Sequence, residues 1–148
     1  MVTVVTEMYG SWSCCAQDAF SVKKLLTKSP KEIFSKNYWL GPNTKAGVFI
    51  LDLGCAKTVN MVELVNTHNG HVRDRGTKEF MVFTSVNKGG PWTLVVHKEL
   101  PDSRHQSDPL PVLSFRFSDR TARFVKFNLI SWYGYGGGLQ YFAVKKGK

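Results

Sequence analysis

The polar segment from Asn66 to Arg75 is the part of the sequence best suited to bind a small molecule. It reads Asn-Thr-His-Asn-Gly-His-Val-Arg-Asp-Arg and places amide, imidazole and guanidinium groups between two expected strands. Such side chains can meet several sugar hydroxyls at once, because each offers fixed donors or acceptors. An alternative is that Asp74 and an arginine pair and brace the loop. The polar contacts are predicted for His68, Asn69, His71, Arg73 and Arg75.

A second candidate segment, residues 131–138, combines aromatic rings with glycines. It reads Ser-Trp-Tyr-Gly-Tyr-Gly-Gly-Gly. Trp132, Tyr133 and Tyr135 can form a platform that stacks on the apolar face of a sugar or on a base, and glycine lets backbone and ligand approach closely. Alternatively, the segment is a tight connection whose aromatic rings cover one end of the core. It is not a phosphate-binding loop, because no Gly-Lys-Ser/Thr follows.

The sequence offers no constellation typical of catalysis. It contains no Gly-x-Ser-x-Gly, no His-Glu-x-x-His and no Cys-x-x-Cys, and its acidic residues are scattered, so we predict a protein that is not an enzyme. His68 and His71 lack the cysteine or carboxylate pair that would complete a zinc site, and no metal is predicted. Cys14, Cys15 and Cys55 make an odd number with two adjacent residues, which indicates reduced thiols rather than a disulfide framework.

In the segments that must position these residues, apolar and polar side chains mostly alternate with period two. Short runs of alternating or continuous apolar residues, separated by turn residues, predict about eight strands. Short helices are expected only near the N-terminus, around residues 18–26 and 29–34. This pattern is typical of an all-β protein, an antiparallel β-sandwich of jelly-roll type. The strands are predicted at 2–5, 48–53, 58–65, 78–86, 92–96, 112–117, 123–130 and 139–144.

Length and charge limit the classes of protein. The 148 residues, 43% hydrophobic and 21% charged, predict one globular domain over 1–148, with a basic tail at 145–148. No apolar run could span a membrane and no export signal is recognised, so the chain as written is expected to be cytoplasmic, or extracellular if it is excised from a larger secreted protein. The formal charge of +9 favours anionic partners. Arg123 and Lys126 lie inside an apolar run and must project from a strand face.

The order and spacing of several short motifs carry a family resemblance over residues 37–144. The motifs are Tyr38-Trp39, Ile50-Leu51-Asp52-Leu53-Gly54, Val62-Glu63-Leu64, Arg75-Gly76-Thr77-Lys78-Glu79-Phe80, Phe83-Thr84-Ser85, Pro91-Trp92-Thr93, Ala122-Arg123-Phe124-Val125-Lys126 and Gly136-Gly137-Gly138-Leu139-Gln140. In this respect the chain resembles the discoidin, or coagulation factor 5/8 type C, family of galactose-binding-like jelly rolls. The resemblance implies a noncatalytic binder that uses loops at one end of the sandwich to hold glycans, anionic phospholipids or proteins.

The resemblance also bears on single residues. An arginine at the position of Arg75 often contacts the sugar in relatives. Apolar residues on protruding loops enter the membrane in lipid-binding relatives, which makes Tyr38 and Trp39 a candidate loop spike, unless Trp39 packs in the core. Many relatives have an aspartate-rich loop that helps to bind calcium, whereas this chain has Ser35-Lys36-Asn37, and a lysine there opposes a hard cation. No cofactor is therefore predicted, and the fucose-binding pattern is matched only at Arg75.

Taken together, these features predict a lectin-like module whose partner is a glycan, bound by the two candidate segments. Two alternatives remain open at this point. The absence of an export signal and the unpaired cysteines favour a scaffold domain that binds another protein inside the cell. The basic charge favours binding of anionic lipid or nucleic acid.

Overall fold

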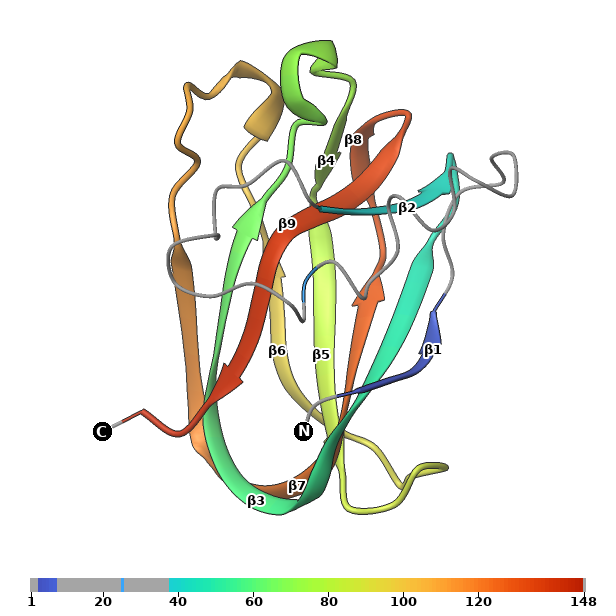
Figure 1. Cartoon of the computed structure of the whole chain (residues 1–148), viewed down its shortest axis with the longest axis vertical. Helices are drawn as coiled ribbons and strands as arrows, with labels where there is room; N and C mark the ends of the chain where they lie inside the picture. The colour runs from blue at the N-terminus through green and yellow to red at the C-terminus, as the bar shows by residue number, and fades with distance from the viewer. Residues whose placement is uncertain (1–2, 8–24, 26–37, 148) are drawn as a thin grey trace.

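The strands of the computed structural model build an antiparallel β-sandwich of jelly-roll type, which confirms the predicted fold class (Figure 1). The structure describes residues 3–7, 25 and 38–147. The larger sheet has the order β2-β9-β3-β7-β5-β6, with β1 paired to β3, and β4 pairs with β8 in a small second sheet. The elements are β1 (Thr3–Glu7), β2 (Trp39–Asn43), β3 (Gly47–Asn66), β4 (Arg75–Thr77), β5 (Glu79–Ser85), β6 (Thr93–Glu99), β7 (Leu113–Leu129), β8 (Trp132–Gly134) and β9 (Gly136–Lys145), with 3₁₀ turns η2 (Gly70–Val72) and η3 (Ser103–His105).

Two long strands, β3 and β7, pass through both layers of the sandwich. They pair from Gly47 opposite Leu129 to Leu64 opposite Leu113. The register shifts where both strands turn from one layer to the other. The prediction of two separate strands in each segment was therefore wrong. Gly54 does not end a strand: it bends β3, with φ 91° and its N–H donating to the Asp52 carboxylate at 2.8 Å.

The fold thus has two ends that differ in construction (Figure 1). We call the lower end in Figure 1 the bend end; it holds the turns of β3 and β7 and the β5–β6 loop, residues 54–58, 117–122 and 86–92. We call the opposite end the loop end. It gathers the connections between the other strands, residues 43–47, 66–76, 100–112 and 130–136.

The centre of the core is a cluster of aromatic rings from different strands. Phe127 lies between Phe49 and Phe80, with ring centroids 5.0 and 5.4 Å apart and nearly parallel planes. Trp39 meets Phe49 edge to face at 5.2 Å. All four side chains are fully buried, and such pairs add stability beyond the burial of apolar area. Trp39 is therefore a core residue, as the alternative left open by the sequence has it, and it is not a loop spike.

The C-terminal lysines are anchored to the sheet. β9 continues through Lys145, which pairs with Glu63, and this hydrogen bond raises the pKa of Lys145. Lys146 pairs with Asp119 at 2.9 Å. The predicted basic tail at 145–148 is therefore corrected for its first two residues, because a carboxylate of the fold holds each of them; Lys148 lies outside the described residues.

Several sequence predictions fall outside the described residues. The two short helices do so except for Leu25, which is buried in the core, and so do Cys14, Cys15 and the segment 35–37. Cys55 is exposed, with a free thiol. No helix in the described part of the chain is long and apolar enough to cross a membrane.

Candidate functional site

The structure brings the two predicted binding segments together at the loop end. β4 follows the polar segment directly and pairs with β8, which begins the aromatic segment. In this small sheet Arg75 lies opposite Gly134, and Thr77 lies opposite Trp132. Residues more than fifty positions apart in the sequence are therefore neighbours at the loop end.

Tyr135 is the aromatic residue that this surface presents to solvent. The residue is 64% exposed, whereas its backbone is held on both sides. The N–H of Tyr135 donates to the carbonyl of Asp74 at 2.8 Å, and the carbonyl of Tyr135 accepts from the N–H of Thr44 at 2.6 Å. The preceding Gly134 has φ 72°, and a Cβ there would overlap the carbonyl of Asp74. The result is an exposed ring on a fixed backbone.

The polar segment forms a tight loop around η2. Asn69 and Arg73 flank this turn, both in the left-handed conformation with φ 65° and 55°. The Asn69 amide donates to the Asp74 carboxylate at 2.8 Å, and its oxygen accepts from the hydroxyl of Tyr38 at 2.9 Å. Burial and the charge of Asp74 raise the pKa of Tyr38. These bonds fix the loop and leave His71 exposed at its tip.

A third segment, residues 100–112, supports the polar loop from the side. The Arg73 guanidinium is exposed and donates from Nη1 to the carbonyls of Arg104 and Gln106 at 3.0 and 2.9 Å. Arg104 in turn pairs with Asp102 at 2.7 Å, and this bond lowers the pKa of the Asp102 carboxyl. The sequence indicated only a polar stretch here; the local signal for its shape is Asp102, whose side chain caps η3.

Arg75 lies inside the loop end. Its side chain is 1% exposed, and its Nη1 donates to the carbonyl of Gly41 at 3.0 Å while Nη2 donates to the Asn43 side chain. A Cβ at Gly136 would come within 2.7 Å of Nη1, so the guanidinium lies closely beneath the start of β9. Burial lowers the pKa of Arg75. In this structure Arg75 braces β2 against β9, and its predicted contact with a sugar stays a prediction.

Three other predicted residues turn inward or bond to the protein. His68 is 4% exposed, with Nε2 2.9 Å from a carboxylate oxygen of Asp108. Tyr133 donates its hydroxyl to the carbonyl of Leu100 at 2.7 Å, and Trp132 is half-buried. The three aromatic residues therefore do not form one open platform. The described residues also contain no group of three or more His, Cys, Asp or Glu side chains that could hold a metal.

Comparison with known proteins relates the chain to solved structures only. No family model matches it, and no curated protein matches it. Chitosan-binding module 1 of a chitosanase/glucanase from Paenibacillus sp. IK-5 superposes with a TM-score of 0.69 at 20% identity, over 97% of this chain and 92% of that one. The family 32 carbohydrate-binding module of EndoD from Streptococcus pneumoniae gives 0.68 at 14% identity, over 99% and 96%.

What these proteins share with the chain is the fold. A third match is the GH29 fucosidase E1_10125 from Ruminococcus gnavus in complex with fucose, with a TM-score of 0.71 at 17% identity. The superposition covers 99% of this chain but only 25% of the fucosidase. The β-sandwich described here therefore occurs both as a carbohydrate-binding module and as a part of a larger enzyme.

Proposed function

We propose that the protein is a noncatalytic carbohydrate-binding module of the galactose-binding-like, discoidin-related type, and that it binds its glycan at the loop end. The observation that carries the proposal is Tyr135, a largely exposed ring whose backbone is bonded to two neighbouring loops. An aromatic ring fixed in this way can stack on the C–H face of a sugar without first losing backbone freedom.

Exposed polar groups of the loop that bonds to the Tyr135 backbone through Asp74 suit the hydroxyls of a sugar. Arg73 donates from a single nitrogen, Nη1, to two carbonyls. These bonds fix the plane of the guanidinium and leave its other N–H groups for a ligand. His71 is exposed beside it. Among the similar structures, a family 32 module from Clostridium perfringens is in complex with GalNAc-β-1,3-galactose, and chitosan-binding module 2 from Paenibacillus sp. IK-5 is in complex with chitotriose. Both ligand classes are the first candidates for this chain.

The test is binding to a glycan array, followed by calorimetry with the best ligand. Tyr135→Ala should weaken binding about tenfold or more, because stacking on an aromatic side chain contributes roughly 1–3 kcal/mol. Leu94→Ala is the matched control, since Leu94 is also an exposed apolar residue, 47% accessible, but lies at the start of β6, next to the β5–β6 loop. Absence of binding across the array, or equal affinity of Tyr135→Ala and the wild type, would contradict the proposal.

A further inference from the structure

Asn69 is followed directly by Gly70 in the polar segment, and it is the only asparagine of the sequence that precedes a glycine. An Asn-Gly pair is especially prone to deamidation in water, because glycine has no side chain to keep its backbone nitrogen away from the asparagine amide. The polar loop therefore contains a reactive pair of residues that neither the glycan contacts nor the fold explains.

The chemistry of this pair needs only water. The backbone nitrogen of Gly70 attacks Cγ of Asn69, and the new N–Cγ bond closes a five-membered succinimide ring. The Cγ–Nδ2 bond breaks, and ammonia leaves with the amide proton of Gly70. Water then adds across a C–N bond of the ring, which opens to aspartate or, through the other carbonyl, to isoaspartate. The net change is an amide replaced by a carboxylate.

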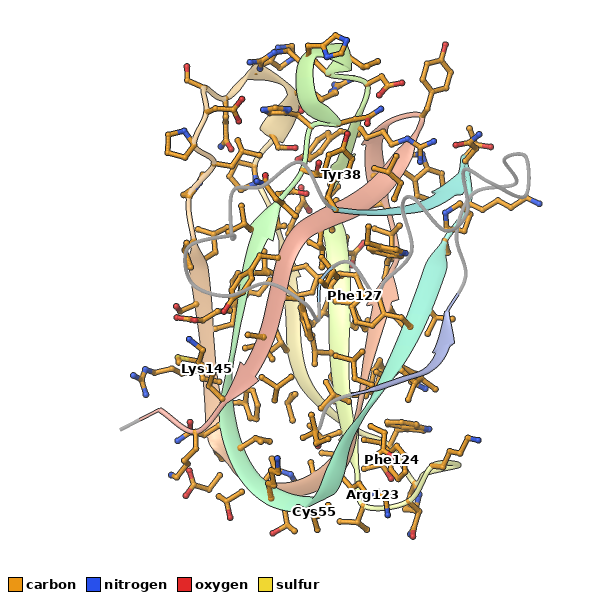
Figure 2. All side chains as sticks on the ribbon, in the orientation of Figure 1. Tyr38, Cys55, Arg123, Phe124, Phe127 and Lys145 are labelled. Atoms are coloured by element: carbon orange, nitrogen blue, oxygen red, sulfur yellow. The ribbon has the colours of Figure 1, made fainter. Side chains whose placement is uncertain are left out.

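The folded loop holds both ends of the Asn69 amide. Nδ2 donates to the Asp74 carboxylate at 2.8 Å, and Oδ1 accepts from the hydroxyl of Tyr38 at 2.9 Å. Tyr38 precedes β2 and lies below the η2 turn in Figure 2, so this second bond ties the loop to another part of the fold. Ring closure breaks both bonds and rotates ψ of Asn69 away from 45°. The fold thus opposes the reaction.

A carboxylate at position 69 would face the carboxylate of Asp74. The two groups would lie at about the distance of the present hydrogen bond, 2.8 Å, where like charges repel each other strongly. The carbonyl of Asp74 accepts from the backbone N–H of Tyr135 at 2.8 Å. Displacement of Asp74 would therefore also loosen the exposed ring of the proposed glycan site.

We propose that Asn69 is a deamidation site, that Tyr38 and Asp74 restrain its reaction in the folded protein, and that its conversion weakens glycan binding. Opening of the loop sets the rate, since the amide reacts only when both bonds are broken. The module would then lose its ligand with age, and sooner wherever the loop opens more often. The effect on binding rests on the proposed function, whereas the rate of deamidation does not.

The first test compares deamidation in the folded full chain and in the chain unfolded in guanidinium chloride, at neutral to slightly alkaline pH. Mass spectrometry of the tryptic peptide 58–73 follows the change over time, and Asn60 and Asn66 in the same peptide are internal references. We expect the reaction at Asn69 alone, slower in the folded chain. Tyr38→Phe should speed the reaction of the folded chain by roughly two- to tenfold, the effect of one neutral hydrogen bond.

The matched control is Tyr133→Phe. It also removes one hydroxyl, which donates to the carbonyl of Leu100 at 2.7 Å, but it leaves the bonds of Asn69 in place. Its rate should equal that of the wild type. Equal rates in Tyr38→Phe and Tyr133→Phe would overturn the proposal, as would equal rates for the folded and the unfolded wild type. Conversion of Asn60 or Asn66 as fast as that of Asn69 would do the same.

The second test measures the effect on the site. Asn69→Asp supplies the product directly, and Asn69→Ser is its control, since serine removes the amide without adding charge. Asn69→Asp should bind the glycan about fivefold or more weakly than Asn69→Ser, because like charges at hydrogen-bond distance repel by more than one neutral hydrogen bond contributes. Equal affinities would refute the effect on binding. If the wild type binds no glycan at all, the proposed function fails, and the rates above still decide whether Asn69 is the modification site.

Discussion

Replacing Arg75 with methionine separates bracing of the fold from direct contact with a ligand. The buried guanidinium bonds to the carbonyl of Gly41 and to the side chain of Asn43. A hydrogen bond to a charged group contributes about 1.5–3 kcal/mol, so losing both removes roughly 3–6 kcal/mol. Methionine recovers part of this because it fills much of the volume and avoids the desolvation of a buried charge. We expect the free energy of unfolding to fall by about 3 kcal/mol.

Arg73→Met is the matched control for this change. Arg73 also donates to two acceptors, the carbonyls of Arg104 and Gln106, but its side chain is exposed. Water can replace those bonds when the guanidinium is removed, so the loss should be below about 1 kcal/mol. The contrast between the two variants measures chiefly the effect of burial, because both replace an arginine with methionine and both arginines donate to acceptors of the protein.

Urea unfolding followed by tryptophan fluorescence gives the free energies, and calorimetry should show Tm lower by roughly 10 °C for Arg75→Met. Glycan affinity is then measured at a temperature at which the variant remains folded. If Arg75→Met unfolds within about 0.5 kcal/mol of the wild type and yet loses glycan binding, the bracing role is refuted. Arg75 would then be a ligand contact, as its position in the sequence first suggested.

Three further predictions concern the fold around the site. Gly134→Ala should cost about 2 kcal/mol or more in thermal unfolding, because φ is 72° and the new Cβ would overlap backbone; Gly89→Ala, with nothing within 4 Å, should change little. Phe127→Ala should cost about 3–5 kcal/mol in urea unfolding, because it empties the centre of the aromatic core. The pKa of the Asp102 carboxyl is lowered in the fold. The ionised carboxylate therefore stabilises the fold above about pH 4, and this contribution is lost as pH falls through the folded pKa. The difference in Tm between Asp102→Asn and the wild type should therefore shrink as pH falls below about 4; curves that stay parallel in acid would contradict this.

The fold was predictable where burial depends on local alternation. The runs 78–86 and 139–144 predicted β5 and β9 closely, and the turn residues between 86 and 92 predicted the β5–β6 hairpin that the register shows. The continuity of β3 and β7 was not predictable in this way. Gly54 is a turn residue by type, and only the pairing of both strands across the bend shows that they continue.

The candidate site was located from the sequence, but the direction of its side chains was not. Arg75 is buried because acceptors on Gly41 and Asn43, more than thirty residues earlier, lie beside it. Tyr133 and Tyr135 are two positions apart and chemically identical, yet one donates its hydroxyl to a carbonyl of another loop and the other is largely exposed. Such differences depend on long-range neighbours, and no local pattern in the sequence contains them.

The positions of the charged residues in the fold also change what the net charge of +9 means. At the loop end, Asp102 and Asp108 lie against Arg104 and His68, and the two arginines of the polar segment already bond to protein acceptors. This end is suited to a neutral ligand with many hydroxyls, since its three carboxylates, Asp74, Asp102 and Asp108, nearly offset its four cations, Lys45, Arg73, Arg75 and Arg104. At the bend end the carboxylates are fewer than the cations, and the excess remains exposed. A basic protein can therefore carry a site for a neutral sugar, provided that its uncompensated charge lies elsewhere on the fold.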